Sequence, residues 1–408
     1  MNLKIDPMKF RFKYLLLLCI NFGLSLNSFC VTNNYVTIKG RQFYDKSGYP
    51  FYPLMCNLKL EIAFESNSVF YIAPHPQNGL STSLFDCTDQ ATCFTQITDE
   101  FVKIKEMGFN CVRIAGSAPY YDKVLKKFYF HGWGNNLVAT YNEEKVYVND
   151  ISDPTDHALE VYFNFLNQIN LLAESLDLYF MIDVCPNFAI PDITDQTSID
   201  NFNNLLRVTG QFINAHDFHN MYCYASVEEP LYTDPGIHSK SRVCDWVNNC
   251  YNTLKQYDPN HLITIGSHDV LDLMEWDLSL LDIDFLQVHV YPDLVDYDGP
   301  DHYRSSTDKV LGRLFWLKIY CTLPWMIGET GYSCKTGYSH PDVSGSETEQ
   351  YDYASETLEF SRSCGASGYS WWFFQETDWN PYEDGLGLLY KGHSPTEAPI
   401  VSASATTS

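Results

Sequence analysis

Short apolar segments alternate with longer amphipathic segments along most of this chain of 408 residues. The short segments are rich in β-branched and aromatic residues, as strands are, and the longer ones carry apolar residues at helical spacing. Such alternation predicts parallel strands covered by helices. We predict eight strands, over residues 51–57, 110–115, 178–184, 222–227, 262–266, 285–291, 325–328 and 368–373.

The longer segments predict the helices between these strands. We place the helices over residues 96–107, 157–176, 199–214, 241–257, 308–320 and 348–363. Eight strands with intervening helices predict an α/β fold, a closed (β/α)8 barrel of the TIM type. Because such a barrel occupies ~250 residues as one domain, we expect a single domain over residues 31–393.

Two segments lie outside this alternation. Residues 35–43, followed by Ser47-Gly48 and the run into Phe51, predict an N-terminal β-hairpin that lies under the floor of the barrel. Residues 117–156 form a long insertion after the second strand, which we predict to be a loop. Long loops after barrel strands usually shape the cleft, so we expect this one to form a cleft wall.

Both ends of the chain are expected to lie outside the barrel. Lys4, Lys9, Arg11 and Lys13 precede an apolar stretch, residues 14–26, which is shorter than the ~20 residues that span a bilayer. Residues 1–30 therefore resemble a secretory signal peptide, and we expect cleavage near residues 28–31 and a secreted protein. An uncleaved membrane anchor is the alternative. Residues 394–408 are rich in Ser, Thr, Pro and Ala and predict a disordered tail.

Thirteen cysteines agree with export, because disulfides persist outside the cell. Cys87 with Cys93, and Cys244 with Cys250, are close enough in sequence to form local bridges. The loop cysteines that could also form bridges are Cys321, Cys334 and Cys364. Those inside predicted strands are expected to be free core thiols: Cys56, Cys111, Cys185 and Cys223. No Cys-x-x-Cys or His-x-x-x-His spacing supports a zinc site.

The charge of the chain excludes several kinds of partner. It carries 51 acidic and 26 basic residues, for a formal net charge of −25. Nucleic acid and anionic membrane surfaces would repel such a chain. A neutral polysaccharide or oligosaccharide fits this charge, and we expect the protein to be a monomer.

Two glutamates end predicted strands in similar surroundings. Glu229 follows the fourth strand, before Pro230, and Glu329 follows the seventh, before Thr330-Gly331. A barrel brings the carboxyl ends of its strands around one mouth, so the two side chains are expected to face each other. A carboxyl pair ~5–5.5 Å apart cleaves a glycosidic bond with retention of configuration. We predict that Glu229 is the acid and Glu329 the nucleophile, with no cofactor and no metal.

Five motifs in order give the chain a family resemblance. They are Gly108-Phe109-Asn110-Cys111-Val112-Arg113, Glu228-Glu229-Pro230, His289-Val290-Tyr291, Ile327-Gly328-Glu329, and Trp371 or Trp372 in the eighth strand. With them the chain resembles the clan A glycoside hydrolases, most closely family 5, which contains cellulases and β-mannanases. The resemblance covers nearly the whole mature length. It implies a secreted retaining glycosidase that cleaves a β-1,4-linked mannan or glucan.

The resemblance also implies roles for the residues around the glutamates. Arg113 would hydrogen-bond Glu329 and keep it ionised. His289 and Tyr291 lie on one face of their strand and would contact the nucleophile and the sugar. A core position for His289 is the alternative. Trp372 would stack on a sugar ring, whereas Trp371 has the spacing of a core residue.

Glu228 departs from the family pattern, which has asparagine before the acid. An ionised Glu228 could only accept a hydrogen bond from the sugar, and it would repel Glu229. Glu228 could itself be the acid, although the proline after Glu229 favours Glu229. The departure motivates a second hypothesis, a catalytically impaired barrel that binds glycan without cleaving it.

Overall fold

The computed structural model describes residues 34–66, 69–75, 87, 89–134, 143–185, 191–230, 239–274, 278–292, 302–334, 345–375 and 385–388. The expected signal peptide and the expected disordered tail lie outside the described residues. Among the helices of the described part, none is both long and apolar enough to cross a membrane.

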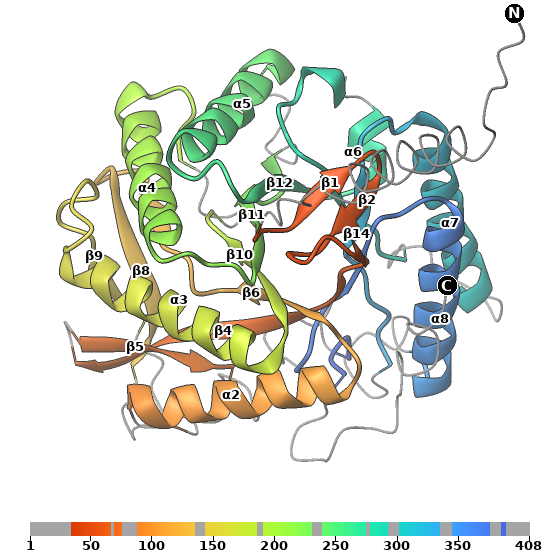
Figure 1. Ribbon diagram of the computed structural model, residues 1–408, viewed down its shortest axis with the longest axis horizontal. Helices are drawn as coiled ribbons and strands as arrows, with labels where there is room; N and C mark the ends of the chain where they lie inside the picture. The colour runs from red at the N-terminus through yellow and green to blue at the C-terminus, as the bar shows by residue number, and fades with distance from the viewer. Residues whose placement is uncertain are drawn as a thin grey trace, which may run out of the picture.

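Eight parallel strands form the centre of the fold (Figure 1). They are β4 (Leu54–Ser66), β6 (Cys111–Ala115), β10 (Tyr179–Asp183), β11 (Met221–Val227), β12 (Leu262–Ser267), β13 (Leu286–His289), β14 (Trp325–Glu329) and β15 (Tyr369–Trp371). Each pairs with the next in this order from β4 to β14, and β15 pairs back with β4. All eight predicted strands are therefore present.

Among these eight strands, the neighbours β14 and β15 are not paired as strands, so the sheet is not closed there. Three backbone hydrogen bonds join the two segments here: from the Ser367 amide to the Trp325 carbonyl at 2.8 Å, from the Ile327 amide to the Gly368 carbonyl at 3.3 Å, and from the Trp372 amide to the Thr330 carbonyl at 2.9 Å. The fold is thus a mixed α/β fold with a large parallel sheet, arranged in the strand order that a (β/α)8 barrel has.

Helices surround the strands in Figure 1. They are α2 (Gln90–Glu106), α3 (His157–Leu176), α4 (Gln196–Ala215), α5 (Lys240–Tyr257), α6 (Val270–Met274), α7 (His302–Tyr320) and α8 (Glu347–Ser363), with a short 3-10 helix, η3 (Leu278–Leu280). Capping boxes at Asp89 and Ser346 start α2 and α8, because each side chain accepts from a backbone amide of the first turn. α2 begins six residues before the predicted helix as a result.

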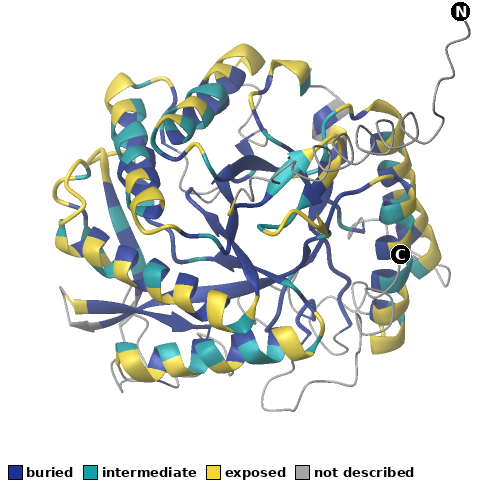
Figure 2. Ribbon diagram, viewed as in Figure 1, coloured by how far each residue is buried: buried dark blue, intermediate teal, exposed yellow. Residues whose placement is uncertain are grey.

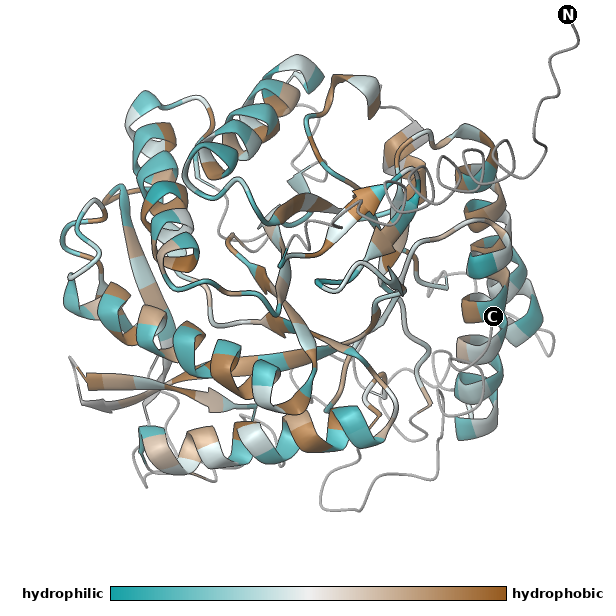
Figure 3. Cartoon of the chain, viewed as in Figure 1, coloured by the Kyte–Doolittle hydropathy of each residue, from teal (hydrophilic) through white to brown (hydrophobic). Residues whose placement is uncertain are grey.

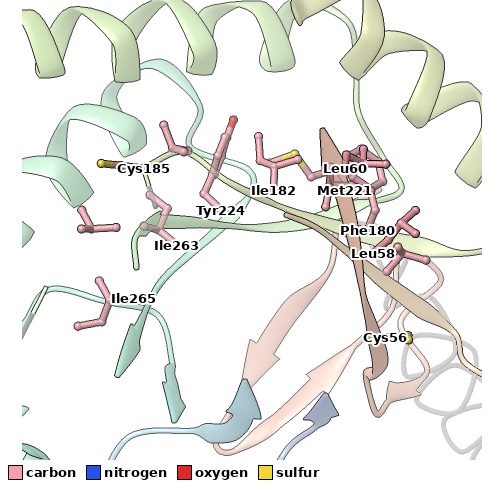
Figure 4. Packing of buried hydrophobic residues seen from close by; sticks show 14 of the residues in the cluster. Cys56, Leu58, Leu60, Phe180, Ile182, Cys185, Met221, Tyr224, Ile263 and Ile265 are labelled. Atoms are coloured by element: carbon pink, nitrogen blue, oxygen red, sulfur yellow. The ribbon is translucent and has the colours of Figure 1, made fainter. Parts of the chain in front are cut away.

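The helices bury one face against the strands and expose the other (Figure 2). The same alternation appears in hydropathy, with apolar residues concentrated on the inner side of the helices (Figure 3). Outward-facing strand residues such as Leu58, Phe180, Ile182 and Ile263 fill the layer between strands and helices (Figure 4). Residues at alternate positions point the other way, into the ring of strands.

A small antiparallel sheet covers the end of the ring at which the strands begin. It consists of β1 (Thr37–Lys39), β2 (Gln42–Tyr44) and β3 (Pro50–Phe51). Phe43 of β2 is fully buried, with its ring centroid 5.0 Å from that of Phe285. The predicted N-terminal hairpin under the floor is confirmed, and it has a third strand.

The prediction of a loop after the second strand was wrong, because three strands lie in the described part of this insertion. β7 (Tyr120–Asp122) and β9 (Glu143–Tyr147) both pair antiparallel with β8 (Lys127–Gly134). β4 continues well past the predicted end of the first strand, and β5 (Val69–Pro74) pairs with this extension. The alternation of buried and half-buried aromatic residues in β8 explains the outcome, since period-two burial is the pattern of a strand.

The cysteine predictions have mixed outcomes. Cys87 and Cys93 form a disulfide. Cys244 and Cys250 do not bridge each other: both are buried in α5, where residues six apart lie on different sides of the helix. No loop disulfide joins Cys321, Cys334 and Cys364 within the part of the chain that the structure describes. Cys56, Cys111 and Cys223, which lie in strands, and Cys185, which follows β10, are buried thiols, as expected.

Candidate active site

Arg113 is the centre of a cluster at the carboxyl ends of the strands. It projects from the middle of β6 and is 2% exposed. Its Nε donates to the carboxylate of Asp183 at 2.9 and 3.2 Å, and Nη1 donates to Oε1 of Glu329 at 2.5 Å. Nη2 lies 3.0 Å from Oε1 of Glu228. These carboxylates offset the cost of burying the guanidinium and raise the pKa of Arg113 well above its usual value.

Glu329 is the last residue of β14 and lies between two donors. Arg113 contacts Oε1, and the Tyr291 hydroxyl donates to Oε2 at 3.0 Å. Both oxygens of Glu329 therefore face donors, which hold the side chain in one position.

Glu229 follows β11 in an unusual backbone conformation, because its φ of 49° lies in the left-handed region. This region costs a residue other than glycine about 1–2 kcal/mol. The Glu229 amide donates to the carbonyl of Gly266 at 3.1 Å, and Oε1 lies 2.7 Å from Nδ1 of His289. Backbone strain of this kind is common where a side chain has to be aimed at a particular point.

His289 contacts both of the predicted catalytic carboxyls. Its Nδ1 is 2.7 Å from Oε1 of Glu229 and 3.5 Å from Oε2 of Glu329. Two carboxyl oxygens that contact one nitrogen atom lie close together, which is compatible with the ~5–5.5 Å between the carboxyls of retaining glycosidases. The structure thus brings together side chains that lie far apart in the sequence.

The three glutamates also act on the imidazole of His289. Its burial lowers the pKa, but the charges of Glu329, Glu229 and Glu228 outweigh this effect and raise the pKa of His289 to about 9. His289 is therefore positively charged near neutral pH and donates its Nδ1 proton to Glu229. His289 is itself a buried, hydrogen-bonded histidine at 2% exposed, and its partners are the glutamates of this cluster.

Glu228 is the most deeply buried glutamate of the cluster, at 4% exposed. Burial, opposed by Arg113, raises the pKa of Glu228 to about 8, so this carboxyl is neutral near pH 7. A neutral carboxyl can donate a hydrogen bond. The limit to accepting that we gave for an ionised Glu228 does not apply to this neutral form.

Glycine at position 266 makes room for this carboxyl. A Cβ atom built on Gly266 of β12 would lie 1.8 Å from Oε2 of Glu228 and 2.9 Å from Nε2 of His289. Neither carboxyl oxygen of Glu228 has a hydrogen-bond partner among the described residues. Oε1 lies 3.0 Å from Nη2 of Arg113 and Oε2 lies 3.4 Å from Nε2 of His289, so both oxygens have ion-pair contacts.

The two tryptophans differ in burial, as their spacing predicted. Trp371 is fully buried, and its indole donates to the carbonyl of Leu386 at 3.0 Å. Trp372 is half-buried, with its ring centroid 5.6 Å from Cζ of Arg113. Trp372 therefore presents an apolar ring beside the carboxyl cluster, whereas Trp371 belongs to the core.

Sequence reasoning missed Asp183, which ends β10 and shares Arg113 with Glu329. Burial raises the pKa of Asp183, with the charge of Arg113 opposing. Its signal in the sequence was the one that identified the glutamates, an acidic residue at the end of an apolar strand. Asn57 of β4 was missed as well; its amide donates to Ser370 and to the carbonyl of Trp371, both at 2.8 Å.

Oxygen and nitrogen atoms of Glu228, His289 and Glu329 lie within 4.8 Å of one another, close enough to hold a metal ion. Arg113 already contacts both of these glutamates. A metal ion would have to displace this buried cation or stand beside it, at a large electrostatic cost. The residues therefore do not fit a resident metal.

Comparisons with known proteins support the fold. The sequence matches no protein-family model, and it has no match among curated proteins. Its structure is similar to the exo-β-1,4-mannosidase Op5Man5 from Opitutaceae bacterium strain TAV5, with a TM-score of 0.57 and 16% identity over 87% of this chain and 59% of that one. It is also similar to a β-D-glucuronidase from Dictyoglomus thermophilum, with a TM-score of 0.54 and 14% identity over 90% of this chain and 52% of that one.

A β-glucuronidase from an uncultured Clostridium species gives a TM-score of 0.53, with 15% identity over 90% of this chain and 52% of that one. This chain thus spans little more than half the length of the structures that it resembles. At such identities the likeness shows the fold alone. The similar structures are clan A glycoside hydrolases, as the resemblance in the sequence implied, but they do not single out family 5.

Proposed function

We propose that the protein is a retaining β-glycoside hydrolase related to family 5. The observation that carries the proposal is the contact of one histidine, His289, with both Glu229 and Glu329. Such a contact suits the short carboxyl separation that double displacement requires. One of the two carboxyls, that of Glu329, is held by Arg113 and Tyr291.

In the first half of the proposed reaction, Glu229 protonates the glycosidic oxygen. A single proton shift over 2.7 Å, from Nδ1 of His289 to Oε1 of Glu229, loads the acid. Glu329 attacks the anomeric carbon as the bond to the leaving oxygen breaks, and the leaving group departs as a neutral alcohol. A glycosyl ester on Glu329 results.

In the second half, water cleaves this ester. Glu229, now ionised, takes a proton from the water as the oxygen attacks the anomeric carbon, and Glu329 leaves as a carboxylate. Arg113 and Tyr291 stabilise the returning negative charge, because both already point at its oxygens. The proton on Glu229 then returns to Nδ1 of His289 over the same 2.7 Å contact, which restores the starting state.

Glu228 and Trp372 are the proposed sugar contacts. The neutral carboxyl of Glu228 donates to a sugar hydroxyl, as the asparagine amide of the resembled family would. The half-buried indole of Trp372 stacks on the apolar face of a pyranose ring. The net charge of −25 favours a neutral polymer, and we infer a β-1,4-linked mannan or glucan as substrate.

The Glu229→Gln variant tests the proposal. Because glutamine cannot protonate the leaving oxygen, we expect kcat on mannan or glucan oligosaccharides to fall by about 10²–10⁴-fold. An activated aryl glycoside, which needs no acid, is expected to react at a rate close to that of the unaltered protein in the glycosylation step. Equal rates for variant and unaltered protein on both substrates would contradict the acid role.

The second candidate, binding of glycan without cleavage, makes the opposite prediction. Incubation of the purified protein with mannan, glucan and xylan would then give tight binding and no reducing ends. The raised pKa of Glu228 disfavours this candidate, because a neutral side chain next to Glu229 adds no repulsion to the site.

We also infer that the protein is exported and acts as a monomer. The N-terminal sequence supports export, and the Cys87–Cys93 disulfide is of the kind that persists in oxidising compartments. Western analysis of culture medium from cells that express the full chain would test this inference, and retention of the protein in the cell pellet would contradict it.

A further inference from the structure

Arg313 is a charged residue of α7 that the fold largely withdraws from solvent. Its side chain is 11% exposed. The other arginine, lysine and aspartate residues of this helix are exposed: Arg304, Asp308, Lys309 and Lys318. Because a guanidinium loses hydration when it is covered, it needs hydrogen-bonding or charged partners inside the protein. The partners of Arg313 therefore indicate what this residue does.

These partners lie at the ends of two neighbouring strands. Nη1 of Arg313 donates to the backbone carbonyl of Tyr291 at 3.1 Å and lies 3.5 Å from Oδ2 of Asp269. Tyr291 follows β13 and Asp269 follows β12. The two strands pair in parallel, so both residues lie where the strands end. The guanidinium thus joins the segments that leave these two strands.

Both segments lead to the proposed catalytic residues. The Tyr291 hydroxyl donates to Oε2 of Glu329 at 3.0 Å. Asp269 comes just after β12, whose Gly266 carbonyl accepts from the Glu229 amide at 3.1 Å. Arg313 is therefore connected to each of the two glutamates through a short segment of chain.

Tyr291 lies beyond the end of the strand ladder. β13 ends at His289, and the last ladder pair of β13 and β14 joins His289 to Glu329. The Val290 amide still donates to the Glu329 carbonyl at 2.8 Å, and Arg313 holds the carbonyl of the following residue. A tyrosine side chain has few rotatable bonds, so its hydroxyl follows the backbone. Since a hydrogen bond weakens steeply with poor geometry, this anchor matters for the contact with Glu329.

We propose that Arg313 is a positioning residue of the active site, which holds the backbone of Tyr291 so that the tyrosine hydroxyl stays on Glu329. A guanidinium is planar and permanently charged, and it can face a carbonyl and a carboxylate at once. The expected effect on the reaction rate rests on the proposed function. The position of the hydroxyl does not, because it is a property of the folded chain.

A double-mutant cycle tests the proposal through activity. Arg313→Ala is expected to lower kcat on mannan or glucan oligosaccharides by about tenfold, with KM within about twofold, because the affected contact acts on the nucleophile. In a Tyr291→Phe background, the same substitution is expected to change kcat by less than about twofold, since the hydroxyl is already absent. Equal fold losses in both backgrounds would overturn the proposal, because a merely structural role does not depend on the hydroxyl.

Two further variants keep the test decisive. Lys318→Ala is the matched control, because Lys318 is also a cation of α7 that donates to a backbone carbonyl, that of Ser363 at 3.1 Å. Its kcat is expected to equal that of the unaltered protein. Arg313→Met retains an apolar stem that can pack as the arginine stem does, and it replaces Arg313→Ala in the cycle if that variant does not fold.

Crystal structures separate this proposal from the proposed function. In folded Arg313→Ala or Arg313→Met, the distance from the Tyr291 hydroxyl to Oε2 of Glu329 is expected to exceed ~3.5 Å, against 3.0 Å with Arg313 present. An unmoved hydroxyl would overturn the positioning role, whether or not the protein is a hydrolase. Absence of hydrolysis by the unaltered protein, with a displaced hydroxyl in the variant, would contradict the enzyme and support the positioning role.

Discussion

At the scale of single residues, Glu228 differs most from what its position in the sequence suggested. An acidic residue next to Glu229 appeared to be a second negative charge in the cleft. The structure buries it between Arg113 and His289, and the pKa of about 8 makes it neutral near pH 7. Burial is the main cause of the raised pKa, and the charges of Asp183 and Glu329 add to it against those of Arg113 and His289.

Glu228→Gln tests this interpretation through activity. Glutamine is also neutral and also donates hydrogen bonds, so kcat/KM at pH 6 is expected to stay within about tenfold of the original. Glu228→Leu, similar in size but unable to donate, should lower kcat/KM well below that of Glu228→Gln. Equal activity of the Leu and Gln variants would contradict a donor role.

At the scale of elements, β12 contributes the space in which Glu228 lies. In Gly266→Ala, the new methyl group would meet Oε2 of Glu228 at 1.8 Å and force the carboxyl to move. We expect kcat/KM to fall by about tenfold or more while the protein remains folded. Gly312→Ala in α7 is the control, because nothing lies within 4 Å of its added Cβ. An active Gly266→Ala protein would show that the position of Glu228 is unimportant.

The N-terminal sheet is expected to matter for stability and not for chemistry. Phe43 of β2 is fully buried against Phe285 and Tyr222, at the end of the fold remote from the glutamates. Phe43→Ala should lower the free energy of unfolding by about 3–5 kcal/mol, because it leaves a cavity. Urea unfolding measures this loss. The kcat should be unchanged at temperatures where the variant is folded, and a large loss of kcat there would contradict the assignment.

At the scale of the whole molecule, the raised pKa of Glu228 links stability to pH. Glutamate in the unfolded chain has a pKa near ~4.3, so between this value and about 8 the folded protein holds a proton that the unfolded chain has lost. The contribution of Glu228 to stability is therefore fully present below ~4.3 and is lost as pH rises through about 8.

Thermal unfolding of Glu228→Gln against the unaltered protein measures this linkage. The Tm difference, variant minus unaltered protein, is expected to increase from pH 5 to pH 8.5, because glutamine has no proton to lose. Glu174→Gln, at an exposed position of α3, is the matched control. A Tm difference that stays constant with pH would contradict the buried neutral carboxyl.

Much of this architecture could be predicted from the sequence, for a physical reason. Strands buried on both sides, such as β10 and β11, are short continuous apolar runs, and the glutamates stand at the ends of such runs. The extension of β4 was missed although Leu58-Lys59-Leu60-Glu61-Ile62 alternates as a strand does; it buries Lys59 and Glu61, which as charged residues are usually exposed. The protonation of Glu228 and the role of Asp183 depend on distances that only the folded chain defines.

The central claim is that Glu329 forms a covalent bond to the sugar while Glu229 supplies the proton. A 2-deoxy-2-fluoro glycoside with a good leaving group slows hydrolysis of the glycosyl ester and lets it accumulate. Mass spectrometry of peptides from the labelled protein should then find one added fluorosugar on Glu329, and none on Glu228 or Glu229. A label on either of those residues, or sugar cleavage without any label, would contradict the account.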